Sequence, residues 1–127
     1  MRMVLLISML LIIFSACENG GVFQEPHIST ISFVQAQDLI ADGDIIIIDV
    51  RTLAEFNTGR IPGAILLQYD TISADTIYFL QGDRRPIFVY CRAGRRSLIA
   101  AEKLQELGFY TIYNLGDGLD SWCGPLE

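Results

Sequence analysis

The hydrophobic positions of this chain change their spacing several times after residue 27. Ile45–Ile48 is an unbroken run of β-branched residues, which is typical of a strand covered on both faces. A second apolar run follows Pro86, a residue that is tolerated at the start of a strand because its missing N–H costs little there. The pattern therefore predicts strands at Ile45–Ile48, Ala64–Leu67, Ile87–Tyr90 and Thr111–Tyr113.

Segments with helical spacing lie between these strands. Helices are predicted from Phe33 to Ala41, from a Thr52 cap through Phe56, over Asp70–Leu80, and on a longer segment that Gly108 ends. On the longest helix, the face predicted to be buried carries Leu98, Ala101, Leu104 and Leu107.

The alternation of strands and helices predicts an α/β fold, in which a mainly parallel central sheet has helices on both faces. A chain of 127 residues has room for one such domain. Ligands of these sheets bind beyond the carboxyl ends of the strands. Asp49, Cys91 and Asn114 each lie at such an end and are the first candidates for a site.

The first sixteen residues differ from the rest of the chain. Arg2 is followed by an apolar run that is shorter than the ~20 residues of a membrane-spanning helix. It is typical of a signal peptide over residues 1–16, and an uncleaved membrane anchor is the alternative. Phe14-Ser15-Ala16-Cys17 resembles the lipobox of bacterial lipoproteins, which prefers Leu at the first position.

The lipobox resemblance implies a lipid on Cys17 and a flexible tether over residues 17–27, with the domain over residues 28–127. The protein is then expected in the bacterial cell envelope. The lipid would anchor it in a membrane, and the domain would face the periplasm or extracytoplasmic side. The choice between the inner and the outer membrane stays open.

Nine Lys and Arg stand against fifteen Asp and Glu, a formal net charge of −6. Nucleic acid is therefore not an expected partner, because phosphate binding needs clustered positive charge. The chain has one His and no Cys-x-x-Cys pair, so its residues suggest neither a metal site nor a Ser-His-Asp triad. We therefore expect no metal and no cofactor. Arg92, Arg95 and Arg96 form a local cationic cluster, which suits a small anionic ligand.

This cluster lies in the segment Cys91–Ser97, between a predicted buried strand and the start of a helix. The helix offers unpaired N–H groups and a positive dipole end, and the small side chains of Ala93 and Gly94 let backbone amides turn inward. Such surroundings lower the pKa of a Cys from ~8.5 by roughly one to several units. The alternative is a small buried Cys that ends a core strand.

Cys91-Arg-Ala-Gly-Arg-Arg-Ser97 resembles the active-site loop of single-domain rhodanese-like sulfurtransferases. A second segment is similar to the N-terminal signature of that family, Ile48-Asp-Val-Arg-Thr-Leu-Ala-Glu-Phe-Asn-Thr-Gly-Arg-Ile-Pro-Gly-Ala64. A third segment that resembles the same family is Leu115-Gly-Asp-Gly-Leu-Asp-Ser-Trp122. The resemblance covers about Ile31 to Pro125 and implies the three-layer rhodanese-like fold.

The resemblance also implies roles for individual residues. Cys91 would be the catalytic nucleophile that carries a persulfide, and Asp49 and Arg51 would brace the site. The amides and charges around its outer sulfur would come from Arg92, Ala93, Gly94, Arg95 and Arg96. Two positions depart from the family pattern, since Arg60 stands where His is usual and Asp117 where a second Gly is common.

The expected reaction moves sulfur from a small anionic donor such as thiosulfate to a thiol, a protein acceptor or cyanide. Two other functions stay open. One is a non-catalytic binding or sensor module, and the other is a phosphatase of the same fold, although phosphatase loops are one residue longer. Cys123 is a candidate resolving thiol for Cys91, against the alternative of an isolated thiol.

Overall fold

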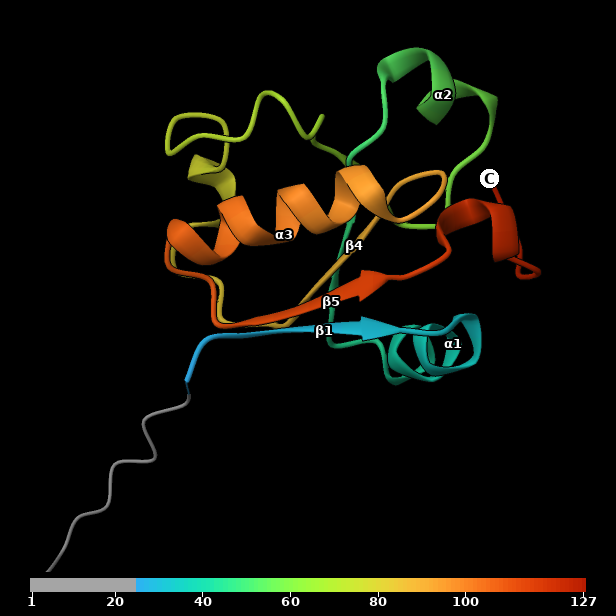
Figure 1. The fold of residues 1–127 in the computed structure, drawn as a ribbon, viewed down its shortest axis with the longest axis horizontal. Coiled ribbons are helices and arrows are strands. Elements are labelled where there is room, and N and C mark those ends of the chain that lie inside the picture. Colours follow the sequence, from blue (N-terminus) through green and yellow to red (C-terminus); the bar gives the residue numbers. More distant parts are fainter. Residues whose placement is uncertain (1–24) are drawn as a thin grey trace, which may run out of the picture.

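The computed structural model describes residues 25–127. The predictions of a signal peptide, of a lipid on Cys17 and of a tether up to residue 24 lie outside the described residues. A five-stranded parallel sheet forms the centre, in the order β1-β5-β4-β2-β3 (Figure 1). Its strands are β1 His27–Ile31, β2 Ile46–Asp49, β3 Ile65–Leu66, β4 Ile87–Tyr90 and β5 Thr111–Leu115.

The two runs predicted as buried strands, β2 and β4, lie side by side near the middle of the sheet. All four residues of each strand are buried. The edge strand β1 was not predicted, and it begins at His27, one residue before the expected start of the domain. Its only buried residue is Ile31, so β1 lacks the run of buried apolar residues that identifies a central strand.

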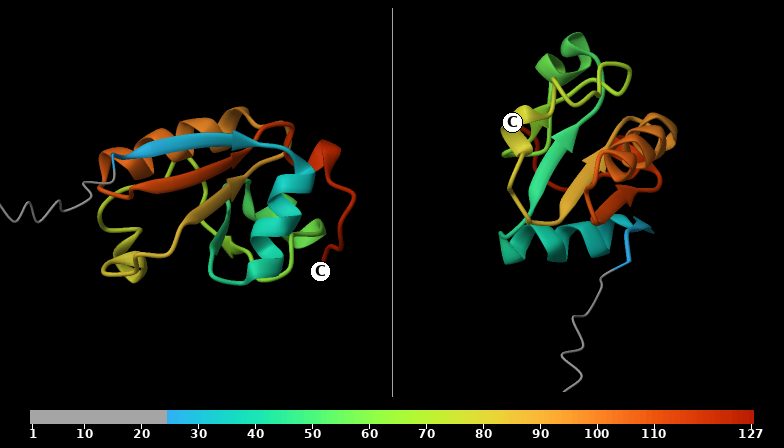
Figure 2. Two further views of the ribbon diagram at one scale, coloured as in Figure 1. Left: turned by 90° about the horizontal axis from the view of Figure 1, so that it is seen from below. Right: turned by 90° about the vertical axis from the view of Figure 1, so that its left-hand side faces the viewer.

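Helices cover both faces of the sheet (Figure 2). Helix α1, Phe33–Asp42, packs on one face and α3, Arg95–Glu106, on the other, while the short α2, Leu53–Thr58, follows β2. Both α1 and α2 begin with a capping box, in which the side chain of Ser32 or Thr52 accepts from the amide three residues on. The predicted α/β fold with a central parallel sheet is confirmed.

The predicted helix over Asp70–Leu80 is wrong. The segment forms turns and ends in one short 3-10 helix, η1, Tyr78–Leu80. The hydroxyl of Thr76 donates to the carbonyl of Thr71 at 2.8 Å and accepts from the amide of Ser73 at 2.8 Å. Hydroxyl side chains that bond nearby backbone groups in this way compete with the helical ladder.

The buried face of α3 is also shifted from the prediction. Ala101 and Leu104 are buried as expected, but Leu98 and Leu107 are 40% and 38% exposed. Ser97 and Ala100 complete the buried face instead. Three of its four residues are therefore small, which lets the helix lie close to the sheet. In the described part of the chain, no helix is long and apolar enough to cross a bilayer.

Candidate active site

Cys91 follows the carboxyl end of β4, and four residues later the chain enters α3. The turn between them depends on Gly94, whose φ of 93° lies in the left-handed region. A Cβ atom on Gly94 would lie 1.9 Å from the carbonyl oxygen of Gly116. Only glycine fits here, and it lets the loop pack directly against the backbone that follows β5.

The C-terminal segment holds this loop from the other side. The amide of Leu119 donates to the carbonyl of Cys91 at 2.9 Å, and the amide of Asp120 donates to the carbonyl of Arg92 at 3.0 Å. Gly118 approaches so closely that a Cβ there would lie 2.3 Å from the Arg92 carbonyl oxygen. The loop around Cys91 is therefore fixed by backbone contacts before any ligand binds.

The Cys91 thiol lies inside this loop, with only 1% of the residue exposed. The amide of Gly94 donates to Sγ at 3.1 Å, and Sγ lies 3.4 Å from Oγ of Ser97. Burial by itself would raise the pKa of Cys91. Hydrogen bonds from the Ser97 hydroxyl and from the amides of Ser97, Ala93 and Gly94 outweigh it and hold the pKa below the ordinary value.

The hydroxyl of Ser97 has two partners for one proton. Its Oγ lies 3.4 Å from Cys91 Sγ and 3.1 Å from the carbonyl oxygen of Gly94. It can donate to the carbonyl while it accepts from the thiol, or turn and donate to the thiolate. Ser97 can therefore serve both protonation states of Cys91, and the charged state gains the stronger hydrogen bond.

Arg96 carries a positive charge that interacts with Cys91, and an ion pair holds its side chain in place. Its two terminal nitrogens donate to the two carboxylate oxygens of Glu55 on α2, each at 2.8 Å. These hydrogen bonds lower the pKa of Glu55 to about 2 and raise the pKa of Arg96. The nearby Cys91 also raises the pKa of Arg96. The ion pair ties the start of α3 to α2 beside the thiol.

The other two arginines of the loop lie at the surface. The Arg92 side chain is 73% exposed and pairs with Asp120, with Nε 3.3 Å from the carboxylate. Arg95 is exposed as well. Among the described residues, the side chain of neither arginine has a hydrogen bond to Cys91. The predicted roles of these two side chains in donor binding therefore stay predictions.

Asp49 and Arg51 form a buried ion pair below the site. Asp49 is fully buried, and its carboxylate accepts from Nη2 of Arg51 at 2.6 Å. The same Nη2 donates to the carbonyl of Gly59 at 2.7 Å, just after α2. The pair thus connects the end of β2 to the end of the helix that carries Glu55, an arrangement that fits the bracing role implied by the sequence.

Two other candidates from the sequence, Asn114 and Cys123, are also placed. Asn114 is buried, and its Oδ1 has no hydrogen-bond partner among the described residues. Cys123 is exposed, and neither it nor Cys91 is in a disulfide, so its resolving role stays a prediction. No group of three or more His, Cys, Asp or Glu within residues 25–127 is placed to hold a metal ion.

Sequence reasoning missed Ser97 and Glu55. Ser97 is the last residue of the quoted loop motif, and its place in the first turn of the helix is the signal that could have identified it. Glu55 completes the capping box with Thr52, which suggested a local role only. Its ion pair joins residues 41 positions apart, and such a contact cannot be read from spacing.

The comparisons with known proteins agree with this geometry. The model of the rhodanese-like domain family matches residues 32–125. The chain belongs to the rhodanese-like domain family. It is 31% identical over 94 residues to the thiosulfate sulfurtransferase GlpE of Pseudoalteromonas translucida, covering 72% of this chain and 86% of that protein.

A second relative is longer than this chain. YrkF of Bacillus subtilis is 30% identical over 102 residues, which cover 80% of this chain but only 53% of YrkF. The chain therefore spans about half the length of that relative. Among solved structures, a rhodanese-like domain protein from Staphylococcus aureus superimposes with a TM-score of 0.69 at 28% identity, covering 78% of this chain and 96% of that one.

Proposed function

We propose that this protein is a sulfurtransferase in which Cys91 carries the transferred sulfur as a persulfide. The observation that carries the proposal is the environment of Cys91 Sγ, which accepts from the Gly94 amide at 3.1 Å and lies 3.4 Å from the Ser97 hydroxyl. Both donors favour a thiolate, and the lowered pKa of Cys91 makes it available for attack. The relatives named as sulfurtransferases support the same reaction class.

The reaction has two steps. The Cys91 thiolate attacks the outer sulfur of a donor such as thiosulfate, a new S–S bond forms, and the S–S bond of the donor breaks as sulfite leaves with the electron pair. An acceptor thiolate or cyanide then attacks the outer sulfur of the persulfide, and the Cys91 thiolate is restored. Neither step needs a general base once the thiol is ionised. Backbone amides and Arg96 stabilise the negative charge that moves through the loop.

Two other functions give different outcomes in the same experiment. A phosphatase would turn over an aryl phosphate at Cys91, and a binding or sensor module would transfer no sulfur at all. We disfavour the phosphatase because the loop is one residue short, so that Arg96 comes five positions after Cys91 instead of six. Gly94 is also in contact with Gly116, so the loop cannot widen there without moving backbone.

The test compares Cys91→Ser with Cys123→Ser, which removes the other described cysteine and serves as the matched control. Each protein is treated with thiosulfate, its mass is measured for the gain of one sulfur atom, and turnover with cyanide and with an aryl phosphate is followed. Wild type and Cys123→Ser should gain sulfur and turn over thiosulfate, and Cys91→Ser should do neither. Equal transfer by Cys91→Ser, or Cys91-dependent phosphatase turnover without sulfur transfer, would contradict the proposal.

We also propose that the protein is a lipoprotein of the bacterial envelope, with the lipid on Cys17. Arg2, the apolar run and Ser15-Ala16-Cys17 support this. Fatty-acid labelling in a bacterial host should be lost in Cys17→Ala. Labelling that persists in this variant, or an intact Met1 in the membrane fraction, would contradict it.

A further inference from the structure

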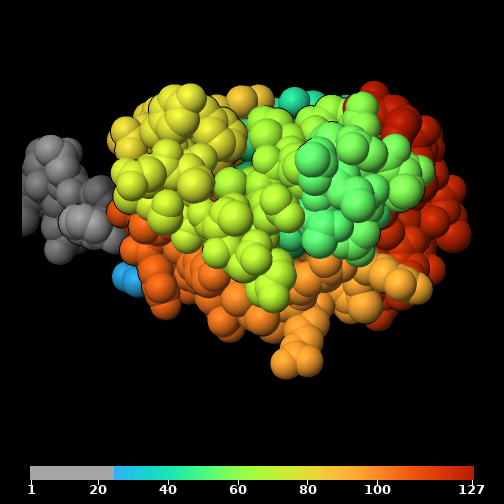
Figure 3. All heavy atoms as spheres, turned by 90° about the horizontal axis from the view of Figure 1, so that it is seen from above, coloured from blue at the N-terminus to red at the C-terminus, as the bar shows by residue number. Residues whose placement is uncertain are grey.

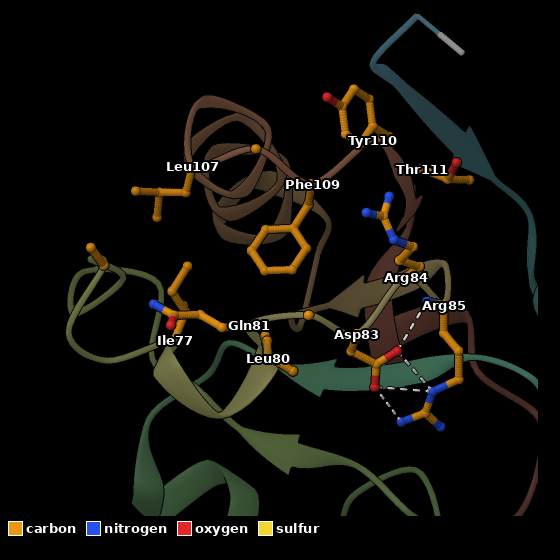
Figure 4. A pocket seen from close by; sticks show the side chains of 13 residues that line it. Ile77, Leu80, Gln81, Asp83, Arg84, Arg85, Leu107, Phe109, Tyr110 and Thr111 are labelled. Carbon is orange, nitrogen blue, oxygen red and sulfur yellow. Dashed lines mark hydrogen bonds and ion pairs between the residues drawn. The ribbon is translucent and has the colours of Figure 1, made fainter. Parts of the chain in front are cut away.

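A cavity in the described part of the chain lies at the opposite end of the sheet from Cys91. Its volume is about 720 Å³, and it opens between η1 with its following loop and the segment that joins α3 to β5 (Figure 4). Ile77 and Leu80 line one side, and Leu107 and Phe109 line the other. Sulfur transfer at Cys91 assigns no role to this cavity.

Large apolar side chains are exposed at the cavity and in the short helix η1 beside it. Tyr110 is 53% exposed and Leu107 38%, and both line the cavity. Tyr78 is 71% and Phe79 44% exposed, in the short helix between two lining residues. Aromatic and leucine side chains gathered at one end of an acidic protein mark an interaction surface.

The charges at the cavity are unlike those of the whole chain, whose net charge is −6. Among the described residues, Asp83 is the only acidic residue that lines it, and Arg85 forms an ion pair with it at 2.7 Å. Arg84 also lines the cavity and has no ion-pair partner within the described range. We call Tyr78, Phe79, Arg84, Leu107, Phe109 and Tyr110 together the Tyr110 face.

The chain enters the domain at this same end. The amide of His27, the first residue of β1, donates to the carbonyl of Tyr110 at 2.8 Å. Figure 3 shows η1 and the loop after it, in yellow, at the end where the blue start of β1 lies. His27 lies ten positions after Cys17, and at ~3.3 Å per residue this stretch spans about 30 Å when fully extended. A lipid on Cys17 would therefore limit the distance of the start of β1, and of Tyr110 beside it, from the membrane to about that length.

We propose that the Tyr110 face rests on the lipid surface of the membrane that holds the anchor. Tyrosine and phenylalanine side chains favour the boundary between headgroups and acyl chains, and surface-bound segments bury their apolar side chains ~5–10 Å deep there. The unpaired Arg84 matches anionic headgroups, which repel the acidic remainder of the domain. The end of the sheet that holds the buried Cys91 then points away from the membrane, toward the water in which small anionic donors diffuse.

This proposal rests on the lipid anchor and does not depend on sulfur transfer. The test uses the full-length lipidated protein in vesicles of phosphatidylethanolamine and phosphatidylglycerol, with plain or brominated acyl chains that quench tryptophan. Tyr110→Trp and Tyr78→Trp each add a probe on the Tyr110 face. Leu53→Trp on α2 is the matched control, because Leu53 is 55% exposed and follows the carboxyl end of β2. Wild type, whose one tryptophan is Trp122, is the baseline.

The tryptophans at positions 110 and 78 should lose about half of their fluorescence or more in brominated vesicles, as expected for side chains at that depth. Leu53→Trp and wild type should lose little. Vesicle-bound protein without quenching at 110 and 78, or with equal quenching at 53, would overturn the proposal and leave the anchor standing. Protein that does not stay with vesicles would overturn both. If the fluorescence of Tyr110→Trp shifts with protein concentration but is not quenched by brominated lipid, a second copy of the protein covers the Tyr110 face instead.

Discussion

Replacing Ser97 with alanine should raise the pKa of Cys91. The Ser97 hydroxyl is 3.4 Å from Sγ, and it is the side-chain donor among the groups that hold this pKa down. A hydrogen bond to a charged acceptor contributes about 1.5–3 kcal/mol, and a long contact to sulfur belongs at the low end. Since 1.36 kcal/mol corresponds to one pKa unit, we expect a rise of about one unit.

The assay is the pH dependence of alkylation of Cys91 by iodoacetamide, read by mass spectrometry in a Cys123→Ser background. Ser97→Ala should move the midpoint to higher pH by about one unit, because the amide donors remain but the hydroxyl is gone. Ser121→Ala is the matched control, since its hydroxyl donates to the Gly118 carbonyl at 3.1 Å beside the same loop. That variant should keep the wild-type midpoint.

A midpoint that stays in place or falls in a folded Ser97→Ala protein would refute this reasoning. Ser97 is fully buried, so thermal unfolding has to be measured on the same sample. If the fold is intact and the midpoint is unchanged, the backbone amides alone lower the pKa of Cys91. The serine would then act only through its hydrogen bond to the Gly94 carbonyl.

Three further substitutions test the surroundings of the thiol through equilibrium unfolding. The pKa of Glu55 lies at about 2, below its usual 4.5, so its ion pair stabilises the fold above pH 4.5 and loses this effect as the pH falls toward 2. Glu55→Gln should therefore lower the free energy of unfolding by about 1 kcal/mol at pH 7. This difference from wild type should disappear as the pH falls from 4.5 toward 2, and a difference that stays constant over that range would contradict the reasoning. Gly94→Ala should lower the free energy of unfolding several times more than Gly108→Ala. Both glycines have positive φ, but only at Gly94 would a Cβ lie 1.9 Å from backbone, and similar losses in the two variants would refute the close contact. Asp49→Asn should cost about 3–5 kcal/mol by leaving a buried guanidinium unpaired, whereas Asp83→Asn, which has the same Asp-x-Arg spacing at the surface, should change stability little.

The sequence by itself determined the class of the fold and the position of the candidate nucleophile, Cys91. Runs of consecutive apolar residues identify β2 and β4 because a strand buried on both faces needs apolar side chains at every position. The loop after β4 could be identified because its chemistry is contiguous, with a thiol, small residues and arginines within seven positions. Patterns formed by residues that are close together in the chain can be read from the sequence without the structure.

Only the tertiary structure decided what surrounds the thiol. Glu55 and Arg96 meet because α2 and α3 both start at the carboxyl edge of the sheet, and no local pattern records that contact. The helix predicted at Asp70–Leu80 failed because hydroxyl groups bond the backbone locally, although Ile72, Ile77 and Leu80 are buried as expected. Which arginines turn toward the thiol likewise depends on partners from distant segments, because a guanidinium follows the carboxylate that packing brings within reach.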